Sequence, residues 1–154
     1  MLTTNTSQRG TGLIEGLIAM LVLSIGLLGM AGLVLHVMRE LGRSEYQSQA
    51  ANAAQTVIGA AFAMTSSNPA ALIKLNGVTT TQFGSVQGAM LQALQTWAND
   101  LQNSLPPGSV GSMQVNSMTG GTCTTPPCVL QVTTTWSDHN QPPVSYVISQ
   151  VMGY

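Results

Sequence analysis

The feature that most constrains this 154-residue chain is a long uncharged stretch near its start. No Asp, Glu, Lys or Arg occurs from Gly16 to Met38, and most of these residues are large and apolar. An α-helix of about 23 residues is roughly 34 Å long, which is enough to cross a bilayer core of about 30 Å. The stretch therefore predicts a membrane-spanning helix, and a plain membrane anchor is its simplest interpretation.

A carboxylate stands at the start of this stretch. Glu15 follows a short polar leader in which Arg9 is the only charged side chain, and Gly10 comes directly after that arginine. An acidic side chain near hydrocarbon is costly, so its presence indicates a function. A secretory signal peptide does not fit, because its apolar stretch is only about 7–15 residues long and its small-residue cleavage site lies beyond that stretch.

The order of Arg9, Gly10, Glu15 and the apolar helix resembles the class III signal of type IV pilins and of type II secretion pseudopilins. In that family a membrane aspartic peptidase cuts after the glycine on the cytoplasmic side. The apolar helix stays on the mature protein, whose fifth residue is glutamate. The resemblance implies cleavage after Gly10 and a mature chain that begins at an N-methylated Thr11. The implied parts are a leader (1–10), a transmembrane and assembly helix (11–38) and a periplasmic globular pilin domain (39–154).

Within this family, the chain resembles minor pilins of the PilV type. Two departures from the major subunit matter: Thr11 stands where phenylalanine is usual, and Gly32 stands where major pilins carry a proline. These departures favour a minor pilin or a pseudopilin over the bulk subunit of a fibre. The shared features are the run LVLSIGLLGMAGL (21–33), a helix with Trp97 and Asp100-Leu101-Gln102 that stops at Leu105-Pro106-Pro107-Gly108, and a strand that ends in Trp136 and Asp138.

The resemblance implies both a fold and a function. The implied fold is α+β and type IV pilin-like, with a long N-terminal helix, half membrane-spanning and half amphipathic, packed on a small antiparallel sheet. The implied function is to help initiate type IV pilus assembly, in support of twitching motility and adhesion. The implied location is the bacterial inner membrane, crossed once with the C-terminal domain in the periplasm, and then the pilus at the cell surface. Partners would be other minor pilins, the major pilin, the prepilin peptidase, the inner-membrane assembly machinery and, before assembly, lipid.

Two alternatives stay open at the level of function. One is a type II secretion pseudopilin, which shares the leader, the glutamate and the helix. The other is an unrelated single-span protein with an extracytoplasmic binding domain. The charge distribution does not decide orientation, because Arg39 and Arg43 lie on the far side of the span from Arg9. A cytoplasmic N-terminus rests on the resemblance and on the cysteine pair.

Glu15 is the candidate assembly residue. In the family this side chain pairs with the positive α-amine at the start of a neighbouring subunit. Opposite charges attract strongly where water is scarce, and an unpaired charge there is costly. The alternative interpretation is a carboxylate solvated at the level of the lipid headgroups.

Glycines recur along the predicted membrane helix. Gly26, Gly29 and Gly32 are spaced three residues apart, and Gly12 and Gly16 form a GxxxG step. Small residues let membrane helices approach closely. We expect these glycines to form a helix-packing surface, the alternative being the ordinary glycine content of a membrane helix.

The apolar pattern changes after Met38. Apolar residues then recur every three to five positions, which is typical of an amphipathic helix. Asn68 precedes Pro69, and a residue before proline disfavours helix. One continuous helix from Leu13 to this point is therefore expected, and two helices with a break near Gly42 are the alternative.

The remainder of the chain predicts a second helix and a small sheet. Residues 70–85 lack a clear period and read as a loop with at most one short strand. Residues 86–105 have helical spacing and end at two prolines. Three alternating runs, 110–118, 129–136 and 144–152, predict an antiparallel meander.

Two cysteines enclose a short loop. Cys123 and Cys128 flank Thr-Thr-Pro-Pro, and we expect them to form a disulfide, which indicates an oxidising compartment. Two free thiols in a mobile loop are the alternative. A zinc site is not expected. His36 would lie at membrane depth, and the two cysteines with His139 alone do not supply a convincing set of ligands.

Composition excludes several classes of function. Charged residues make up only 6% of the chain, against about 25% in typical soluble domains. Four Lys and Arg residues cannot form a nucleic-acid surface. Asp138 and His139 are adjacent, so in a strand they would point to opposite faces and could not cooperate in catalysis. We therefore expect that the chain is not an enzyme and that it binds no cofactor and no metal. Trp97 and Trp136 are large aromatic residues, and we expect both to lie in the core.

Overall fold

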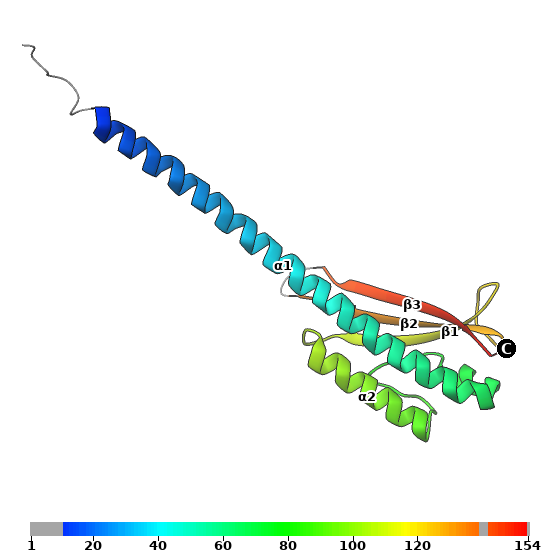
Figure 1. Ribbon diagram of the computed structural model, residues 1–154. Helices are drawn as coiled ribbons and strands as arrows, with labels where there is room; N and C mark the ends of the chain where they lie inside the picture. Colours follow the sequence, from blue (N-terminus) through cyan, green and yellow to red (C-terminus); the bar gives the residue numbers. More distant parts are fainter. Residues whose placement is uncertain (1–10, 139–141, 154) are drawn as a thin grey trace, which may run out of the picture. The chain divides into compact units, whose positions relative to one another are not determined.

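A computed structural model describes residues 11–138 and 142–153. The chain is α+β, as predicted, and forms two compact units, residues 1–43 and 44–154. Figure 1 shows the elements in chain order, which are α1 (Thr11–Ser67), η1 (Pro69–Leu75), α2 (Ala89–Ser104), β1 (Val110–Ser117), β2 (Cys128–Trp136) and β3 (Val144–Met152).

Helix α1 is 57 residues long and passes through Gly42 without a break. The prediction of one continuous helix is therefore confirmed, and the two-helix alternative is wrong. The helix ends where the sequence indicated, since Ser67 is its last residue and Pro69 follows shortly after. The main-chain N–H of Asn68 still donates to the carbonyl oxygen of Met64 (3.3 Å), which satisfies one of the carbonyls that a helix end leaves free.

The sheet is an antiparallel meander in the order β1-β2-β3, as expected from the three alternating runs. In the central strand Val132 lies opposite Met113 on one side and Ile148 on the other. Strand β2 buries every second residue because successive side chains point to opposite faces. The buried row is Cys128, Leu130, Val132, Thr134 and Trp136.

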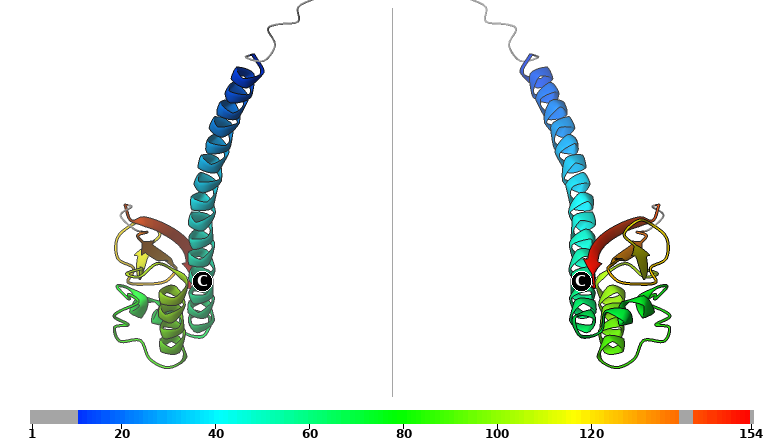
Figure 2. Two further views of the ribbon diagram at one scale, coloured as in Figure 1. Left: turned by 90° about the vertical axis from the view of Figure 1, so that its left-hand side faces the viewer. Right: turned by 90° about the vertical axis from the view of Figure 1, so that its right-hand side faces the viewer.

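The core of residues 44–154 lies between helices and sheet. Figure 2 shows α2 beside the C-terminal part of α1, with the strands to one side of α1. Small side chains on α1 allow close packing, and Trp97 from α2 is 1% exposed in the same cluster as residues of the sheet. The expectation that both tryptophans belong to the core is confirmed. The α1 residues in the cluster are Ala50, Ala54, Val57 and Ala61.

Residues 70–85 differ from the expected loop. Pro69–Leu75 forms a 3₁₀ helix, with proline in its first turn and Leu72 and Leu75 fully buried. A single short helix of this kind produces no long hydrophobic period, which is why the sequence did not predict it. Helix α2 begins three residues later than predicted, because Gly88 has a φ of 69°, outside the helical range.

The segment after η1 covers the outer edge of β1. Met113 donates its N–H to the carbonyl oxygen of Val78 (2.7 Å) and accepts from the N–H of Gly77 (3.0 Å). The N–H of Thr80 donates to the carbonyl oxygen of Gly111 (2.9 Å), and the hydroxyl of Thr80 accepts from the N–H of Gly111 (3.1 Å). The main-chain groups on this edge of the sheet are therefore paired within the domain.

Candidate functional site

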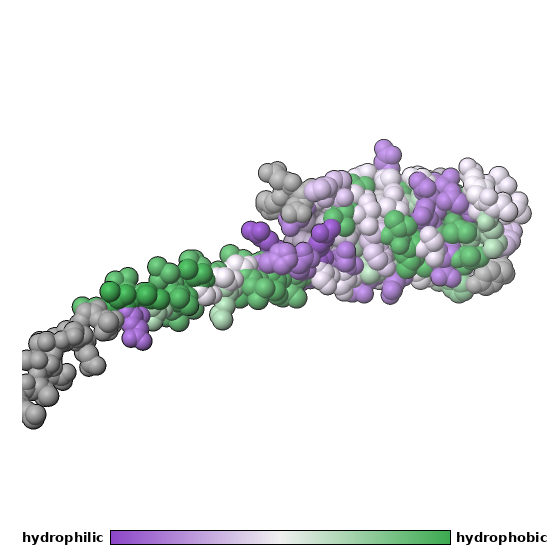
Figure 3. Space-filling model, turned by 90° about the horizontal axis from the view of Figure 1, so that it is seen from above, coloured by the Kyte–Doolittle hydropathy of each residue, from purple (hydrophilic) through white to green (hydrophobic). Residues whose placement is uncertain are grey.

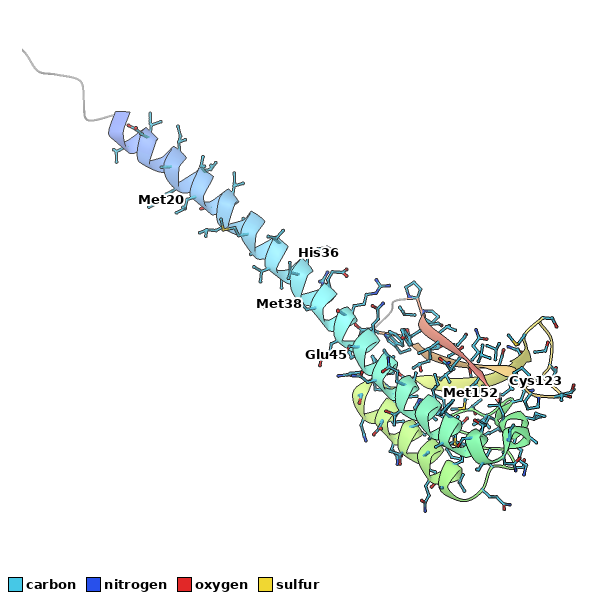
Figure 4. All side chains as sticks on the ribbon, turned by 45° about the vertical axis from the view of Figure 1, so that its right-hand side comes forward. Met20, His36, Met38, Glu45, Cys123 and Met152 are labelled. Carbon is cyan, nitrogen blue, oxygen red and sulfur yellow. A yellow bond between two sulfur atoms is a disulfide. The ribbon has the colours of Figure 1, made fainter. Side chains whose placement is uncertain are left out.

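The site is the apolar segment, defined as residues 12–38 of α1. Its side chains are exposed throughout, with Leu13 76% and Leu28 74% exposed. Among the described residues, α1 is the one helix long and apolar enough to cross a membrane, judged by length and composition. Figure 3 shows the segment mostly in the colour of hydrophobic residues, and Met20, His36 and Met38 project outward from α1 in Figure 4.

Such a surface is unstable in water. Burying one large aliphatic side chain is favourable by about 1.5–3 kcal/mol, and the apolar segment carries many of them. An exposed apolar patch of this size marks contact with a membrane or with another protein. The apolar segment is therefore a surface suited to contact with a membrane or with another protein.

Glu15 is the one carboxylate within the apolar segment. Its side chain is exposed, and apolar residues flank it along the helix at Ile14, Leu17 and Ile18. The next acidic residue along the chain is Glu40. Hydrocarbon cannot solvate a charge, so in a membrane this carboxylate would need water, headgroups or a cation nearby.

The predicted packing glycines all lie on an open surface. A Cβ atom added at Gly12, Gly16, Gly26, Gly29 or Gly32 would meet no other atom within 4 Å. Their role is therefore not to relieve crowding inside this chain. Backbone that is bare of side chains allows close approach of another helix.

Polar groups in and after the apolar segment are few. The hydroxyl of Ser24 donates to the carbonyl oxygen of Met20 (2.7 Å), so its hydrogen-bonding need is met within the helix. Beyond Met38 come Arg39, Glu40 and Arg43, all exposed. Charges that begin at the end of an apolar stretch fit the border between hydrocarbon and water.

Residues of the expected cleavage site, and one histidine for which no site is expected, lie outside the described residues. Gly10, after which cleavage is expected, is one of them, and Thr11 is part of α1. His139 also lies outside the described residues, so the structure does not bear on its relation to Asp138. The expected cleavage and N-methylation stay predictions.

The two cysteines lie at disulfide distance. The Cα atoms of Cys123 and Cys128 are 5.9 Å apart, their sulfurs are bonded in the structure, and both residues are buried. The bond closes the connection between β1 and β2, where the N–H of Cys123 donates to the carbonyl oxygen of Val115 (3.2 Å). Pro126, inside the ring, lies so close to Gly153 that a Cβ there would be 2.8 Å from it. The ring therefore packs against the backbone at Gly153.

A cleft of about 350 Å³ is present on the domain formed by residues 44–154. Lys74 in its wall is exposed and is the only Lys or Arg in that part of the sequence. One exposed lysine in a wall of mixed polar and apolar residues does not make a binding site, so the cleft receives no functional assignment. Its lining residues are Met64, Ala71, Lys74, Ser85, Val86 and Gln87.

Within residues 11–138 and 142–153, no three His, Cys, Asp or Glu side chains gather in a way that could hold a metal ion. No protein-family model, curated protein or solved structure matches the chain.

Proposed function

We propose that this chain is a type IV pilus minor pilin that helps to initiate pilus assembly. In this role its apolar segment anchors the subunit in the inner membrane and then joins a bundle of related helices. The proposal rests mainly on one observation: an exposed apolar helix segment contains a single carboxylate and continues into a helix of an α+β domain.

The energetics of the apolar segment support a subunit that exchanges lipid for protein. Lipid covers its aliphatic side chains before assembly, and neighbouring apolar helices cover them afterwards. The five open glycines allow those neighbours to approach closely. Such an exchange changes little in the environment of Leu and Ile side chains, so other groups must favour assembly.

Glu15 is the group that distinguishes the two environments. In lipid it has no cation, whereas in a bundle it can pair with the α-amine of a neighbouring chain that begins at Thr11. Two unit charges about 4 Å apart attract by roughly 4 kcal/mol at an effective dielectric constant near 20. This pairing requires removal of the leader, because cleavage after Gly10 creates the α-amine at Thr11. Leader processing and assembly are linked in this way.

The partners in this proposal are other minor pilins, the major pilin and the inner-membrane assembly machinery. The bonded cysteine pair supports a globular domain on the periplasmic side, since disulfides persist in oxidising compartments. The pilus then carries the subunit to the cell surface and serves twitching motility and adhesion.

Deletion of the gene in its own organism tests the function. We expect loss of surface pili and of twitching motility, with type II secretion intact and with restoration by the wild-type gene. Loss of secretion with normal piliation would instead identify a pseudopilin. Normal pili, normal secretion and an uncleaved N-terminus would leave an independent single-span protein and overturn the proposal.

A further inference from the structure

The two edges of the sheet differ in how their main-chain groups are satisfied. On β1 the main-chain N–H and C=O groups of the odd-numbered residues point away from β2. Those of Gly111 and Met113 are bonded by the segment 76–80, which covers that edge. Val115 continues the row, because its N–H donates to Oδ1 of Asn76 (3.0 Å) and its carbonyl accepts from Cys123. The outer edge of β1 is therefore closed.

The outward-pointing groups of β3 follow from the register. In an antiparallel ladder, alternate residues of a strand bond one neighbour and the residues between them bond the other. Because the odd-numbered residues of β1 form their main-chain hydrogen bonds outward, the even-numbered ones bond to β2, where their partners are odd-numbered. The even-numbered residues of β2 therefore bond to β3, where their partners are also even-numbered. The N–H and C=O groups of Ser145, Val147 and Ser149 consequently point away from the sheet. These three residues are called the β3 edge below.

No described element covers the β3 edge. Within residues 11–138 and 142–153, no main-chain hydrogen bond reaches these groups from outside the sheet. Figure 1 shows β3 as the outermost strand, and Figure 3 looks onto that side of the domain, where hydrophobic, weakly polar and strongly hydrophilic patches alternate.

The usual protections of an edge strand are also absent from β3. Natural edges carry lysine, proline or a bulge, or they are covered by another element. Strand β3 contains no charged residue and no proline, and its pairing with β2 proceeds residue by residue from Val144 to Met152 without a bulge. A closed edge on β1 and an unprotected edge on β3 in the same small sheet indicate that β3 is kept open.

We propose that the β3 edge binds an extended, uncharged segment of another polypeptide chain as a fourth strand. A row of alternating donors and acceptors is satisfied by an extended main chain, which is the recognition mode of strand addition. The core-side row of Val144, Tyr146 and Ile148 is only partly buried, so residues of the added strand beside it would be apolar. The absence of charge on β3 leaves an acidic or basic strand without a counter-charge. The inference does not depend on the proposed function.

Amide hydrogen exchange by NMR on the full chain in detergent micelles tests the proposal. The probe is a capped heptapeptide of alternating Thr and Val, N-methylated at every valine so that one edge can bond and the peptide cannot stack into fibrils. Its control is the same peptide N-methylated at every internal residue. In the free chain we expect the β3-edge amides to exchange fast and the amides of Tyr146 and Ile148 to be protected.

The first peptide should slow exchange at the β3 edge by at least about tenfold and leave β1 unchanged, and the control peptide should have no effect. Val147→Pro removes one outward N–H and places a ring on the edge, so it should abolish the protection at Ser145 and Ser149, whereas Val147→Thr should retain it. If Val147→Pro also loses protection at Tyr146, Ser149→Pro replaces it.

Three results would overturn the proposal. The first is a β3 edge as protected as Tyr146 in the free chain. The second is equal protection by both peptides, which would show that micelle partitioning rather than hydrogen bonding causes the effect. The third is protection that rises with protein concentration alone, which would make a second copy of this chain the occupant.

Discussion

At the scale of single residues, Glu15 differs from the other carboxylates of α1 in its surroundings. Glu45 lies on the part of the helix that belongs to the folded domain, and it accepts a hydrogen bond from Nε2 of Gln49 (3.2 Å). Glu40 lies beside Arg39, just beyond the apolar segment. Only Glu15 stands among apolar side chains that need lipid or protein around them.

Glu15→Ala should therefore affect assembly and nothing else. We expect leader cleavage, membrane insertion and the unfolding of the globular domain to be unchanged, because Glu15 makes no contribution to the domain core. Co-purification with partner pilins should fall at least about tenfold, the equivalent of about 1.4 kcal/mol, and surface pili should decrease with it. Quantitative immunoblots of affinity-purified complexes and pilus counts measure both effects.

Glu40→Ala is the matched control, since it removes a carboxylate from the same helix outside the apolar segment. Glu15→Asp should be intermediate, because the charge remains but the side chain is shorter. Wild-type co-purification and piliation in the Glu15→Ala strain would show that the carboxylate is solvated rather than paired.

Gly111 is required for a different reason, which is space. A Cβ on this residue would overlap the ring of Trp97 and come within 2.9 Å of Cδ1 of Leu101. Both neighbours are large buried side chains of α2, so neither can move aside without disturbing the core. The glycine lets α2 lie directly on β1.

Gly111→Ala should destabilise the domain by about 1–3 kcal/mol, the usual cost of overfilling a packed core. Gly59→Ala is the control: this glycine is exposed on α1 and no atom lies within 4 Å of the position that a Cβ would take, so alanine there should stabilise by up to about 1 kcal/mol. Urea unfolding of the full chain in detergent, followed by tryptophan fluorescence, measures both. An unchanged midpoint for Gly111→Ala would mean that α2 does not press on β1.

At the scale of elements, hydrophobic period decided what could be predicted. Strand β3 has the predicted bounds, and β1 and β2 each differ by one residue at one end, because their side chains alternate between core and solvent. Helix α1 was predictable from its length and from Pro69. The η1 helix was not, although the three-residue spacing of Leu72 and Leu75 was its one visible signal.

The closed edge of β1 likewise could not be predicted from the sequence. It depends on Thr80 and Asn76 reaching a strand more than thirty positions later, and no local pattern marks such a contact. For the candidate site, Glu15 and the glycines could be identified from the sequence because exposed membrane-type segments obey simple rules of length and polarity. The partners proposed for them belong to other chains, so neither the sequence nor the fold of this chain specifies those partners.

The disulfide is the element-scale prediction. Replacing Cys123 and Cys128 together by alanine should lower the free energy of unfolding by roughly 2 kcal/mol, the chain-entropy value for so small a ring. The pair should be oxidised in protein taken from the native envelope, with neither thiol alkylated before reduction. Unfolding of the wild type with reductant is the control and should match the variant. Two thiols that alkylate without reduction would contradict the disulfide.

At the scale of the whole molecule, the chain combines a segment that needs covering with a domain that has its own core. The domain of residues 44–154 buries most of its large apolar residues, with Phe62 and Met118 among the exposed exceptions, whereas the apolar segment exposes them throughout. We expect the chain to stay with the membrane fraction after an alkaline carbonate wash, which removes peripheral proteins. The double variant Leu23→Lys, Leu27→Lys should be released, because each charge near the bilayer centre costs about 2.5–3.5 kcal/mol. Arg39→Lys with Arg43→Lys is the control and should leave the chain membrane-bound.

The whole proposal depends on removal of the leader and retention of the helix, and the mass of the mature chain in its own organism measures both at once. We predict an intact mass that corresponds to a chain starting at Thr11, with one added methyl group, in membrane and pilus fractions alike. In the Gly10→Val strain we expect only the longer precursor, because glycine, which lacks Cβ, suits a peptidase that must pass the backbone closely through its site. A chain that starts at Met1 in the wild type, or normal processing of Gly10→Val, would contradict the proposal.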